Sequence, residues 1–464
     1  MRDLIALAIV AGCSTPAPPP SVVVPSIPVY KPQPRDTGAA PATQPQPTSG
    51  KQPAGPPTRL PSVIHGSRGE PVVTRGTRDV GGATIRVLLS SSTPTARVSS
   101  PSGFMLVDRA GSLVGREPRA GVWQIERAGR RVRAVRPDGV PTVWIDAPII
   151  ARPQDDGLLA VGGKPYRGDL AFFGADTGLA VINVVKIDDY LRGVVPLEIG
   201  TKSEDDSAAV QAQTVAARSY AYIHLTTEPS RIYDVTGGTL DQVYGGVQAE
   251  TPVASEAVES THALVVKYAG RVVNAPYSST CGGITAGASE VWRSNDEPYL
   301  QSVSDQIPGS SRYYCDIAPR FHWTRTIEGA DLNAALARYL ANYTTVPGKR
   351  PGIAREVSIN GHTTSGRVAT IKIATDRGSF IVRGNDIRYV LRQVGGEILN
   401  STYFSVESAT GLDGMLSQLI IRGNGYGHGV GMCQWGAIGR ARAGQDFLTI
   451  LRTYYPGTTV GPAE

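Results

Sequence analysis

The residues with the clearest chemical potential lie in a glycine-rich segment near the end of the sequence. Residues 423–437 read GNGYGHGVGMCQWGA and place His428, Cys433, Gln434 and Trp435 among glycines. Glycine adopts positive φ angles and lets a ligand or another strand approach the backbone, whereas alternate glycines weaken an ordinary strand or helix. We therefore interpret the segment as a loop that forms a site, with a bulged hairpin or a tight packing crossing as the structural alternative.

Motif spacing and charge exclude several other kinds of protein. The glycines do not fit the dinucleotide pattern G-x-G-x-x-G, and the sequence contains no G-x-x-x-x-G-K-[ST], H-E-x-x-H or G-x-S-x-G motif. The 46 Lys and Arg residues against 40 Asp and Glu residues give a formal net charge of +6. This mild excess suits a wall polymer or an anionic surface, and it is not the dense basic stripe of a nucleic-acid-binding protein.

An ordered series of motifs gives the glycine-rich segment its meaning. It consists of DYLRGVVPLE at 189–198, AAVQAQTVAARSYAY at 208–222, DQVYGG at 241–246, YSSTCGGIT at 277–285, VW at 291–292, PYL at 298–300 and YYPG at 454–457. With the glycine-rich segment, the series resembles the SpoIID/LytB family over about residues 80–460. The order of the motifs makes the resemblance more specific than any one of them.

The resemblance implies a lytic transglycosylase that cleaves the bond between N-acetylmuramic acid and N-acetylglucosamine in peptidoglycan, preferably in strands that have lost their stem peptides. Such an enzyme needs one carboxyl group, which acts first as general acid and then as base, and it leaves a 1,6-anhydro product. Glu198 matches the family's catalytic glutamate, and apolar Val194, Val195 and Leu197 are expected to raise its pKa by desolvation. The alternative is a non-catalytic glycan-binding enhancer of an N-acetylmuramoyl-L-alanine amidase.

The resemblance also implies a set of substrate-binding candidates: Gln213, Arg218, Gln242, Tyr244, Tyr277, His428 and Gln434. For Gln213 and Arg218 a structural polar contact is the alternative, since buried polar groups need partners in either case. A half-buried tyrosine is also commonly part of a core. His428 is expected to bind the glycan or to orient Glu198, with a structural role in the loop as the alternative.

Three cysteines leave their chemistry open. With Cys13 assigned to a lipid, Cys281, Cys315 and Cys433 form an odd set in an oxidising compartment. One possibility is a Cys281–Cys315 disulfide, and another is three free thiols. A third is a zinc ion held by the three thiols and His428, although no C-x-x-C pair supports it. We therefore expect no cofactor, with zinc as the alternative.

The amino terminus predicts export and anchoring. Residues 1–13 contain a short apolar run that ends in VAGC, which resembles a bacterial lipobox with Cys13 as the lipidated residue. Ser14 resembles the outer-membrane sorting class, so we expect a lipoprotein on the periplasmic face of that membrane. A plain secretory signal is the alternative. Residues 14–60 are rich in proline and poor in aromatics, which predicts a disordered tether.

The rest of the sequence predicts an α+β protein with mainly antiparallel strands, because helices are few and do not alternate regularly with strands. Residues 61–165 are expected to form a β-rich module, and residues 166–464 the SpoIID/LytB-like catalytic region. We expect helices at 207–224, capped by Ser207, and at 328–345. Strands are expected at 179–186, 368–373, 379–383 and 399–406, with a turn at 188–191.

Overall fold

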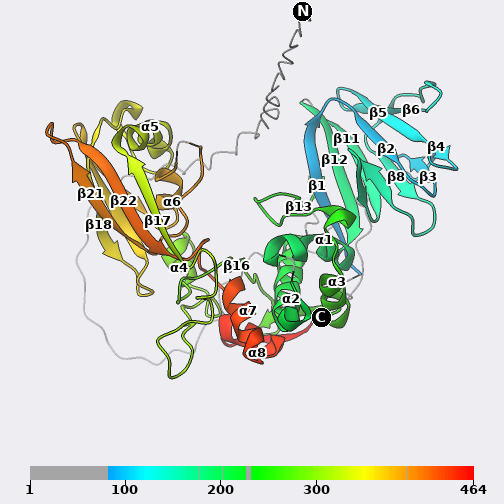
Figure 1. The fold of residues 1–464 in the computed structure, drawn as a ribbon. Helices are drawn as coiled ribbons and strands as arrows, with labels where there is room; N and C mark the ends of the chain where they lie inside the picture. Colours follow the sequence, from blue (N-terminus) through cyan, green and yellow to red (C-terminus); the bar gives the residue numbers. More distant parts are fainter. Residues whose placement is uncertain (1–81, 176, 201, 226–230, 394, 464) are drawn as a thin grey trace, which may run out of the picture. The chain divides into compact units, whose positions relative to one another are not determined.

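The computed structural model describes residues 82–175, 177–200, 202–225, 231–393 and 395–463 (Figure 1). The predicted lipobox at Cys13 and the predicted tether at 14–60 lie outside these residues. Within the described part, none of the helices combines the length and the apolar character that crossing a membrane requires. The α+β prediction is confirmed: the paired strands of the described part are antiparallel except at a few short contacts.

Two facing antiparallel sheets form the first part of the fold. The larger sheet has the order β13 (Val235–Thr236), β1 (Thr84–Thr93), β12 (Gly178–Lys186), β11 (Asp169–Ala175), β8 (Ile149–Pro153), β3 (Phe104–Val107) and β4 (Leu113–Glu117). The smaller sheet has the order β10 (Lys164–Tyr166), β9 (Leu159–Val161), β2 (Ala96–Ser99), β5 (Val122–Ala128), β6 (Arg131–Val135) and β7 (Ile145–Asp146). Alternating residues are buried in β5 and β6, which is the pattern of strands with one face on a core. Phe104 and Trp123 join the sheets through an edge-to-face ring contact.

The larger sheet extends beyond the boundary that the sequence predicted between residues 165 and 166. Strand β12 pairs with β1 from Thr84↔Lys186 onward, and β11 pairs with both β12 and β8. Central strands of one sheet therefore lie on both sides of that boundary. The β-rich module ends at Lys186, where the chain enters the first helix.

A group of helices follows, with α2 (Ser207–His224) packed against α1 (Ile187–Ile199), α3 (Pro252–Ser260), α7 (Gln434–Arg442) and α8 (Phe447–Tyr454). The predicted helix at 207–224 is confirmed. It is rich in alanine, which has high helix propensity and whose small side chain lets neighbouring elements approach closely. The predicted cap is wrong, because the N-cap position is Asp206 rather than Ser207. The side chain of Asp206 makes no capping hydrogen bond. The predicted turn at 188–191 is also wrong, because α1 begins at Ile187.

Short elements complete this region around the helices. They are a small sheet of β15 (Arg271–Val272), β14 (Leu264–Tyr268) and β24 (Thr459–Pro462), the parallel pair β16 (Tyr277–Ser278) and β23 (Met432–Cys433), and helix α4 (Ala288–Val291). The pair β16–β23 joins two of the family motifs, because Tyr277 lies opposite Met432 and Ser278 opposite Cys433. One continuous hydrophobic core runs through the first sheets, these helices and the short elements.

A second β module with a separate core lies between the cysteine motifs and the glycine-rich segment. Its sheets are β17 (His322–Glu328), β22 (Leu416–Asn424) and β21 (Phe404–Thr410), and β18 (Ala354–His362), β19 (Val368–Thr375) and β20 (Gly378–Arg383), with helices α5 (Gly329–Tyr339) and α6 (Asp386–Val390) (Figure 1). Leu332, Ile371 and Leu419 are fully buried in its core. The predicted strands at 368–373 and 379–383 are confirmed. The predicted helix at 328–345 ends earlier, at Tyr339, and the strand predicted at 399–406 begins only at Phe404.

Candidate active site

Glu198 lies in the last turn of α1, on a helix whose apolar face is fully buried. Val194 and Val195 are 0% exposed, whereas Leu197 is exposed and Glu198 is partly exposed. One carboxylate oxygen, Oε1, accepts a hydrogen bond of 2.8 Å from the backbone N–H of Val243. Burial raises the pKa of Glu198, and the Val243 hydrogen bond opposes this rise. The side chain therefore combines access with a raised pKa, which are the properties that a general acid needs.

The charge of Glu198 affects the pKa values of three tyrosines. Burial raises the pKa of Tyr190, Tyr220 and Tyr277, and the negative charge of Glu198 adds to each shift. Tyr190 donates to the side-chain oxygen of Gln242 at 3.3 Å, and the amide nitrogen of Gln242 donates to the Tyr277 hydroxyl at 2.9 Å. Gln242 therefore connects two phenols, and it is itself only 1% exposed.

The predicted residues Gln213 and Gln434 contact each other, and Gln434 also contacts the backbone of Glu198. The Nε2 atom of Gln434 donates to the backbone oxygen of Glu198 at 3.1 Å and to the side-chain oxygen of Gln213 at 3.2 Å. Gln213 is fully buried, and among the described residues its own Nε2 has no hydrogen-bond partner. The glycine-rich segment is thus tied to the backbone at the catalytic candidate through one glutamine side chain.

Two other candidates make the contacts of their structural alternatives. Arg218 is fully buried, and its guanidinium donates to the Asp188 carboxylate at 2.8 Å and to the backbone oxygens of residues 258, 261 and 264. Tyr244 is 8% exposed, and its hydroxyl donates to Asn183 at 2.8 Å. Because their polar atoms contact the protein itself, both residues support the site from within rather than line it.

Asp241 is a second carboxyl group near the same phenols, and protein donors occupy both of its oxygens. Oδ1 accepts from the Tyr220 hydroxyl at 2.9 Å, and Oδ2 accepts from the backbone and side chain of Thr236, both at 2.8 Å. By contrast, in the described part of the chain Glu198 Oε2 has no hydrogen-bond partner. Glu198 is therefore the carboxyl group with an oxygen available to a substrate.

The glycines of the 423–437 segment are required by packing of the protein against itself. Gly431 has φ +70°, and a Cβ there would overlap the backbone oxygen of Pro276. Gly429 has φ +82°, and a Cβ there would overlap the guanidinium of Arg367. The tight packing crossing, which was the structural alternative, therefore accounts for these glycines, while Gln434 reaches the site.

His428 contacts the backbone of its own loop and the ring of Trp292. Its Nδ1 atom accepts from the Val430 N–H at 3.1 Å, and its ring lies 5.1 Å from that of Trp292. Burial, followed by the charge of Arg388, lowers the pKa of His428 to about 4, so the ring is neutral near neutral pH. No hydrogen bond joins His428 to Glu198 among the residues that the structure describes, and these contacts are those of its structural alternative.

The cysteines are free thiols in the structure, and a carboxylate lies with them instead of the histidine of the zinc alternative. Cys281, Cys315 and Cys433 are all buried. Their Sγ atoms and a carboxylate oxygen of Asp305 lie within 4.8 Å of one another. In the zinc alternative His428 would be the fourth member of this set, but its ring packs on Trp292 and it is not among the residues that the structure groups with the cysteines.

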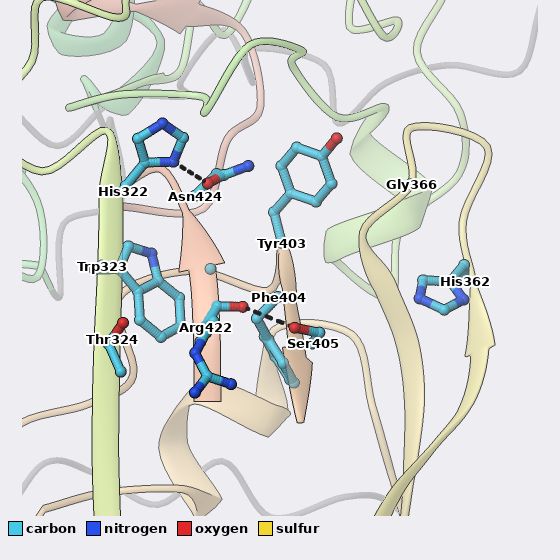
Figure 2. Close-up of a pocket in the computed structure, with 11 residues that line it drawn as sticks. His322, Trp323, Thr324, His362, Gly366, Tyr403, Phe404, Ser405, Arg422 and Asn424 are labelled. Carbon is cyan, nitrogen blue, oxygen red and sulfur yellow. Dashed lines mark hydrogen bonds between the residues drawn. The ribbon is translucent and has the colours of Figure 1, made fainter. Parts of the chain in front are cut away.

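A pocket of about 730 Å³ lies in the second β module, and Gly423 and Asn424 at the start of the glycine-rich segment also line it. Figure 2 shows His322, Trp323, Tyr403 and Arg422 among the side chains that line it. The Nδ1 atom of His322 lies 2.7 Å from the side-chain oxygen of Asn424. Neither Glu198 nor any predicted substrate-binding residue lines this pocket, so it is a feature separate from the candidate active site.

Sequence reasoning left several functional candidates unassigned. Tyr190 and Tyr220 stood inside the motifs, and Tyr220 follows Gln213 by seven residues, a spacing that places both on one helical face. Asp241 is the first residue of the DQVYGG motif, so its place in a motif was the available signal. Asp305 and Arg367 belong to no motif, and nothing local in the sequence indicates that they meet the cysteines.

Comparisons with known proteins agree with this arrangement. Residues 175–268, which include Glu198 and Gln213, match the family described as SpoIID, Stage II sporulation protein. An uncharacterized protein of Brachyspira hyodysenteriae is 31% identical over 313 residues, covering 67% of this chain and 76% of the relative. The chain belongs to the SpoIID/LytB family. Residues 312–431 match a second family, described as a domain of unknown function, DUF8618.

Two relatives from Bacillus subtilis carry functional names. One, named amidase enhancer, is 31% identical over 307 residues, covering 58% of this chain and 40% of the relative. The other, named stage II sporulation protein D, is 28% identical over 296 residues, covering 60% of this chain and 76% of the relative. This member of the SpoIID/LytB family is therefore similar to proteins with two different functional names.

Proposed function

We propose that this SpoIID/LytB-family protein is a peptidoglycan lytic transglycosylase with Glu198 as its single catalytic carboxyl group. The supporting observation is the difference between two carboxylates. Protein donors occupy both oxygens of Asp241, whereas Glu198 is held through Oε1 alone and has a raised pKa. A glycosidase that uses water employs two available carboxyl groups, whereas an internal cyclisation needs one.

The proposed reaction moves one proton out and one proton back. Glu198 donates its proton to the oxygen that leaves with N-acetylglucosamine, and the bond from that oxygen to C1 of N-acetylmuramic acid breaks. The C6 hydroxyl oxygen of the muramoyl residue then bonds to C1, and its proton returns to Glu198. No water is consumed, and the product ends in a 1,6-anhydro ring. The Val243 N–H would hold the carboxylate in place through both steps.

The buried polar groups around Glu198 have supporting roles in this proposal. Gln434 holds the backbone of Glu198 and also bonds Gln213, so it sets the position of the end of α1. Tyr277 is partly exposed and carries a phenol with a raised pKa, so it remains protonated and can donate to a sugar hydroxyl. These contacts orient the substrate and the acid without adding a second nucleophile.

A second candidate function is enhancement of a cell-wall amidase, and the similarity to the Bacillus subtilis amidase enhancer favours it. In that role the same surface would bind glycan strands without cutting them. Digestion of purified glycan strands that lack stem peptides, followed by mass spectrometry, separates the proposals. Ends lighter by one water than reducing ends support the transglycosylase, and reducing ends would direct attention to Asp241 as a second carboxyl group. Uncut strands together with a faster amidase support the enhancer.

A further inference from the structure

Four buried side chains from distant parts of the chain bring metal-binding atoms together. Cys281, Asp305, Cys315 and Cys433 are each 0% exposed, and their Sγ and carboxylate oxygen atoms lie within 4.8 Å of one another. Cys281 follows β16, and Cys433 lies in β23 and caps α7. Asp305 and Cys315 come from the loop that precedes the second β module. The fold itself, rather than a local motif, creates this group.

The spacing within the group suits tetrahedral coordination. The Sγ atoms of Cys281 and Cys315 are 3.6 Å apart, and Cys281 Sγ lies 3.6 Å from Asp305 Oδ2. Two thiolates bound to one tetrahedral zinc ion at bonds of about 2.3 Å are about 3.8 Å apart. Three sulfurs with one carboxylate oxygen form a complete set of four ligands of the types that zinc prefers.

The neighbouring charges also point to an anionic centre. Arg440 donates to Asp305 Oδ1 from Nη2 at 2.9 Å and from Nε at 3.1 Å. Arg367 is 1% exposed and donates from Nη2 to the backbone oxygen of Cys281 at 2.7 Å. Its Nε and Nη1 atoms are buried and have no hydrogen-bond partner among the described residues. A buried guanidinium with unused donors beside Cys281 and Cys433 indicates that negative charge belongs there.

The charges balance when a divalent metal is present. Three thiolates and one carboxylate around a divalent ion leave two net negative charges, which the guanidinium groups of Arg367 and Arg440 would offset. Without a metal, three neutral thiols add no negative charge beside Arg367, and Glu290 is the carboxylate whose charge acts on it. A Cys281–Cys315 disulfide would also remove two potential thiolates and leave Cys433 unpaired.

Backbone donors are already aimed at one of the sulfurs. Cys433 Sγ accepts from the N–H of Cys281 at 3.1 Å and from the N–H of Gly436 at 3.3 Å. Hydrogen bonds of this kind hold thiolate ligands in metal sites. The Oδ1 atom of Asp305 likewise accepts from the Tyr454 hydroxyl at 2.8 Å, which leaves Oδ2 directed at the cysteines.

We propose that Cys281, Cys315, Cys433 and Asp305 bind one structural zinc ion. All four positions are filled by protein, and the group is buried, so the site is closed and its role is to fasten the fold. It would join the glycine-rich segment to the Tyr277–Thr285 motif. Because Gln434 follows Cys433 directly and bonds Glu198, the metal would fix the backbone that supports the candidate acid. The inference does not depend on the proposed function, since metal content is measured without substrate.

The test measures zinc in the purified full-length chain. We expect about one zinc ion per chain after reconstitution with zinc in reducing buffer and removal of excess metal. Cobalt in place of zinc gives a readout that needs no variant, because tetrahedral thiolate ligation produces intense visible bands and a near-ultraviolet charge-transfer band. Binding should release protons from the thiols, which an unbuffered titration detects.

Variants identify the ligands. We expect Cys315→Ser and Asp305→Asn to weaken zinc affinity at least 10-fold in competition with a chelating dye, while the cobalt bands shift or fade. His428→Asn is the matched control, because His428 is the fourth ligand in the alternative that the sequence offered. This variant should keep the zinc affinity of the parent protein. Retained affinity in Asp305→Asn with loss in His428→Asn would overturn the proposed ligand set.

Two further outcomes would overturn the metal itself. One is a wild-type chain that holds less than a tenth of an equivalent of zinc and shows no cobalt bands after full reduction. The other is a peptide map, made without reduction, in which Cys281 and Cys315 are disulfide-linked and the reduced chain still takes up no metal. A circular dichroism spectrum equal to that of wild type for each variant separates loss of a ligand from loss of the fold.

Discussion

The Oε1 atom of Glu198 accepts a 2.8 Å hydrogen bond from the backbone N–H of Val243, which joins the end of α1 to the DQVYGG motif. The two residues are 45 positions apart, and each belongs to a different motif. The hydrogen bond fixes one oxygen of the carboxyl group and leaves the other without a partner in the described part of the chain. A fixed and partly exposed carboxyl group with a raised pKa is the basis of the first three predictions.

Replacing Glu198 with glutamine should remove glycan cleavage while leaving the fold intact. Glutamine keeps the size of the side chain, and its amide oxygen can still accept from the Val243 N–H, but it has no titratable proton. We expect turnover to fall by about 10²–10⁴, the usual effect of losing a general acid or base. The measurement is the rate of appearance of anhydromuramoyl ends on glycan without stem peptides.

Glu256→Gln is the matched control for this substitution. Glu256 is an exposed residue of α3, so the same chemical change there should leave both turnover and stability unchanged. Binding of glycan strands to Glu198→Gln should equal that of wild type in a pull-down assay. Full activity in Glu198→Gln would refute the assignment of the acid.

The pH dependence of cleavage should show an alkaline limb set by Glu198. As an acid, Glu198 works only when protonated, so kcat/KM should fall as pH rises through its pKa. Because burial raises this pKa, the limb should lie above about pH 4.3, the value of an ordinary glutamate. The measurement is a pH–rate profile, and a limb at or below the ordinary value would contradict the role of burial.

The same raised pKa has a consequence for stability that needs no substrate. A carboxyl group with a folded pKa above its unfolded pKa stabilises the folded state fully at pH values below the unfolded pKa. This contribution is lost as pH rises through the folded pKa. Relative to Glu198→Gln, wild type should therefore lose unfolding free energy as pH rises over that interval. Parallel denaturant titrations of the two proteins at several pH values measure the difference.

Arg218 should prove structural rather than substrate-binding. Its guanidinium is fully buried and donates to the Asp188 carboxylate and to three backbone oxygens, so truncation leaves several buried acceptors without a donor. We expect Arg218→Gln to lower the unfolding free energy by about 3–5 kcal/mol, the usual cost of breaking a buried ion pair. Arg271→Gln, at an exposed arginine of β15, is the control and should change stability little. A stable Arg218→Gln protein that no longer binds glycan would show that the residue contacts substrate.

The sequence predicted those parts of the site that local patterns encode. Helix α2 was predictable because alanine has high helix propensity over the whole segment 207–224. Glu198 was identified by its motif. Its helix was missed, because Gly193, Pro196 and the β-branched valines all have low helix propensity. Burial of the apolar face of α1 outweighs these preferences.

Long-range contacts were beyond the sequence. Asp305 meets Cys433 across 128 positions, and no spacing rule connects an aspartate in a loop with a cysteine that precedes a helix. The sequence offered His428, five residues before Cys433, only as the fourth ligand of the zinc alternative. In the structure the His428 ring packs on Trp292 and Asp305 takes the place beside the cysteines.

Two glycines with nearly the same backbone conformation allow a test of why the glycine-rich segment needs its glycines. Gly431 has φ +70° and Gly414 has φ +72°, so alanine at either position carries the same left-handed strain of about 1–2 kcal/mol. A Cβ at Gly414 would meet nothing within 4 Å, whereas a Cβ at Gly431 would overlap the backbone oxygen of Pro276. We expect Gly414→Ala to cost only the strain, and Gly431→Ala to cost at least about 2 kcal/mol more, because backbone atoms must move apart. Unfolding free energies from denaturant titration measure both. Equal costs for the two variants would mean that the segment tolerates a side chain at Gly431 and that conformational freedom alone explains its glycines.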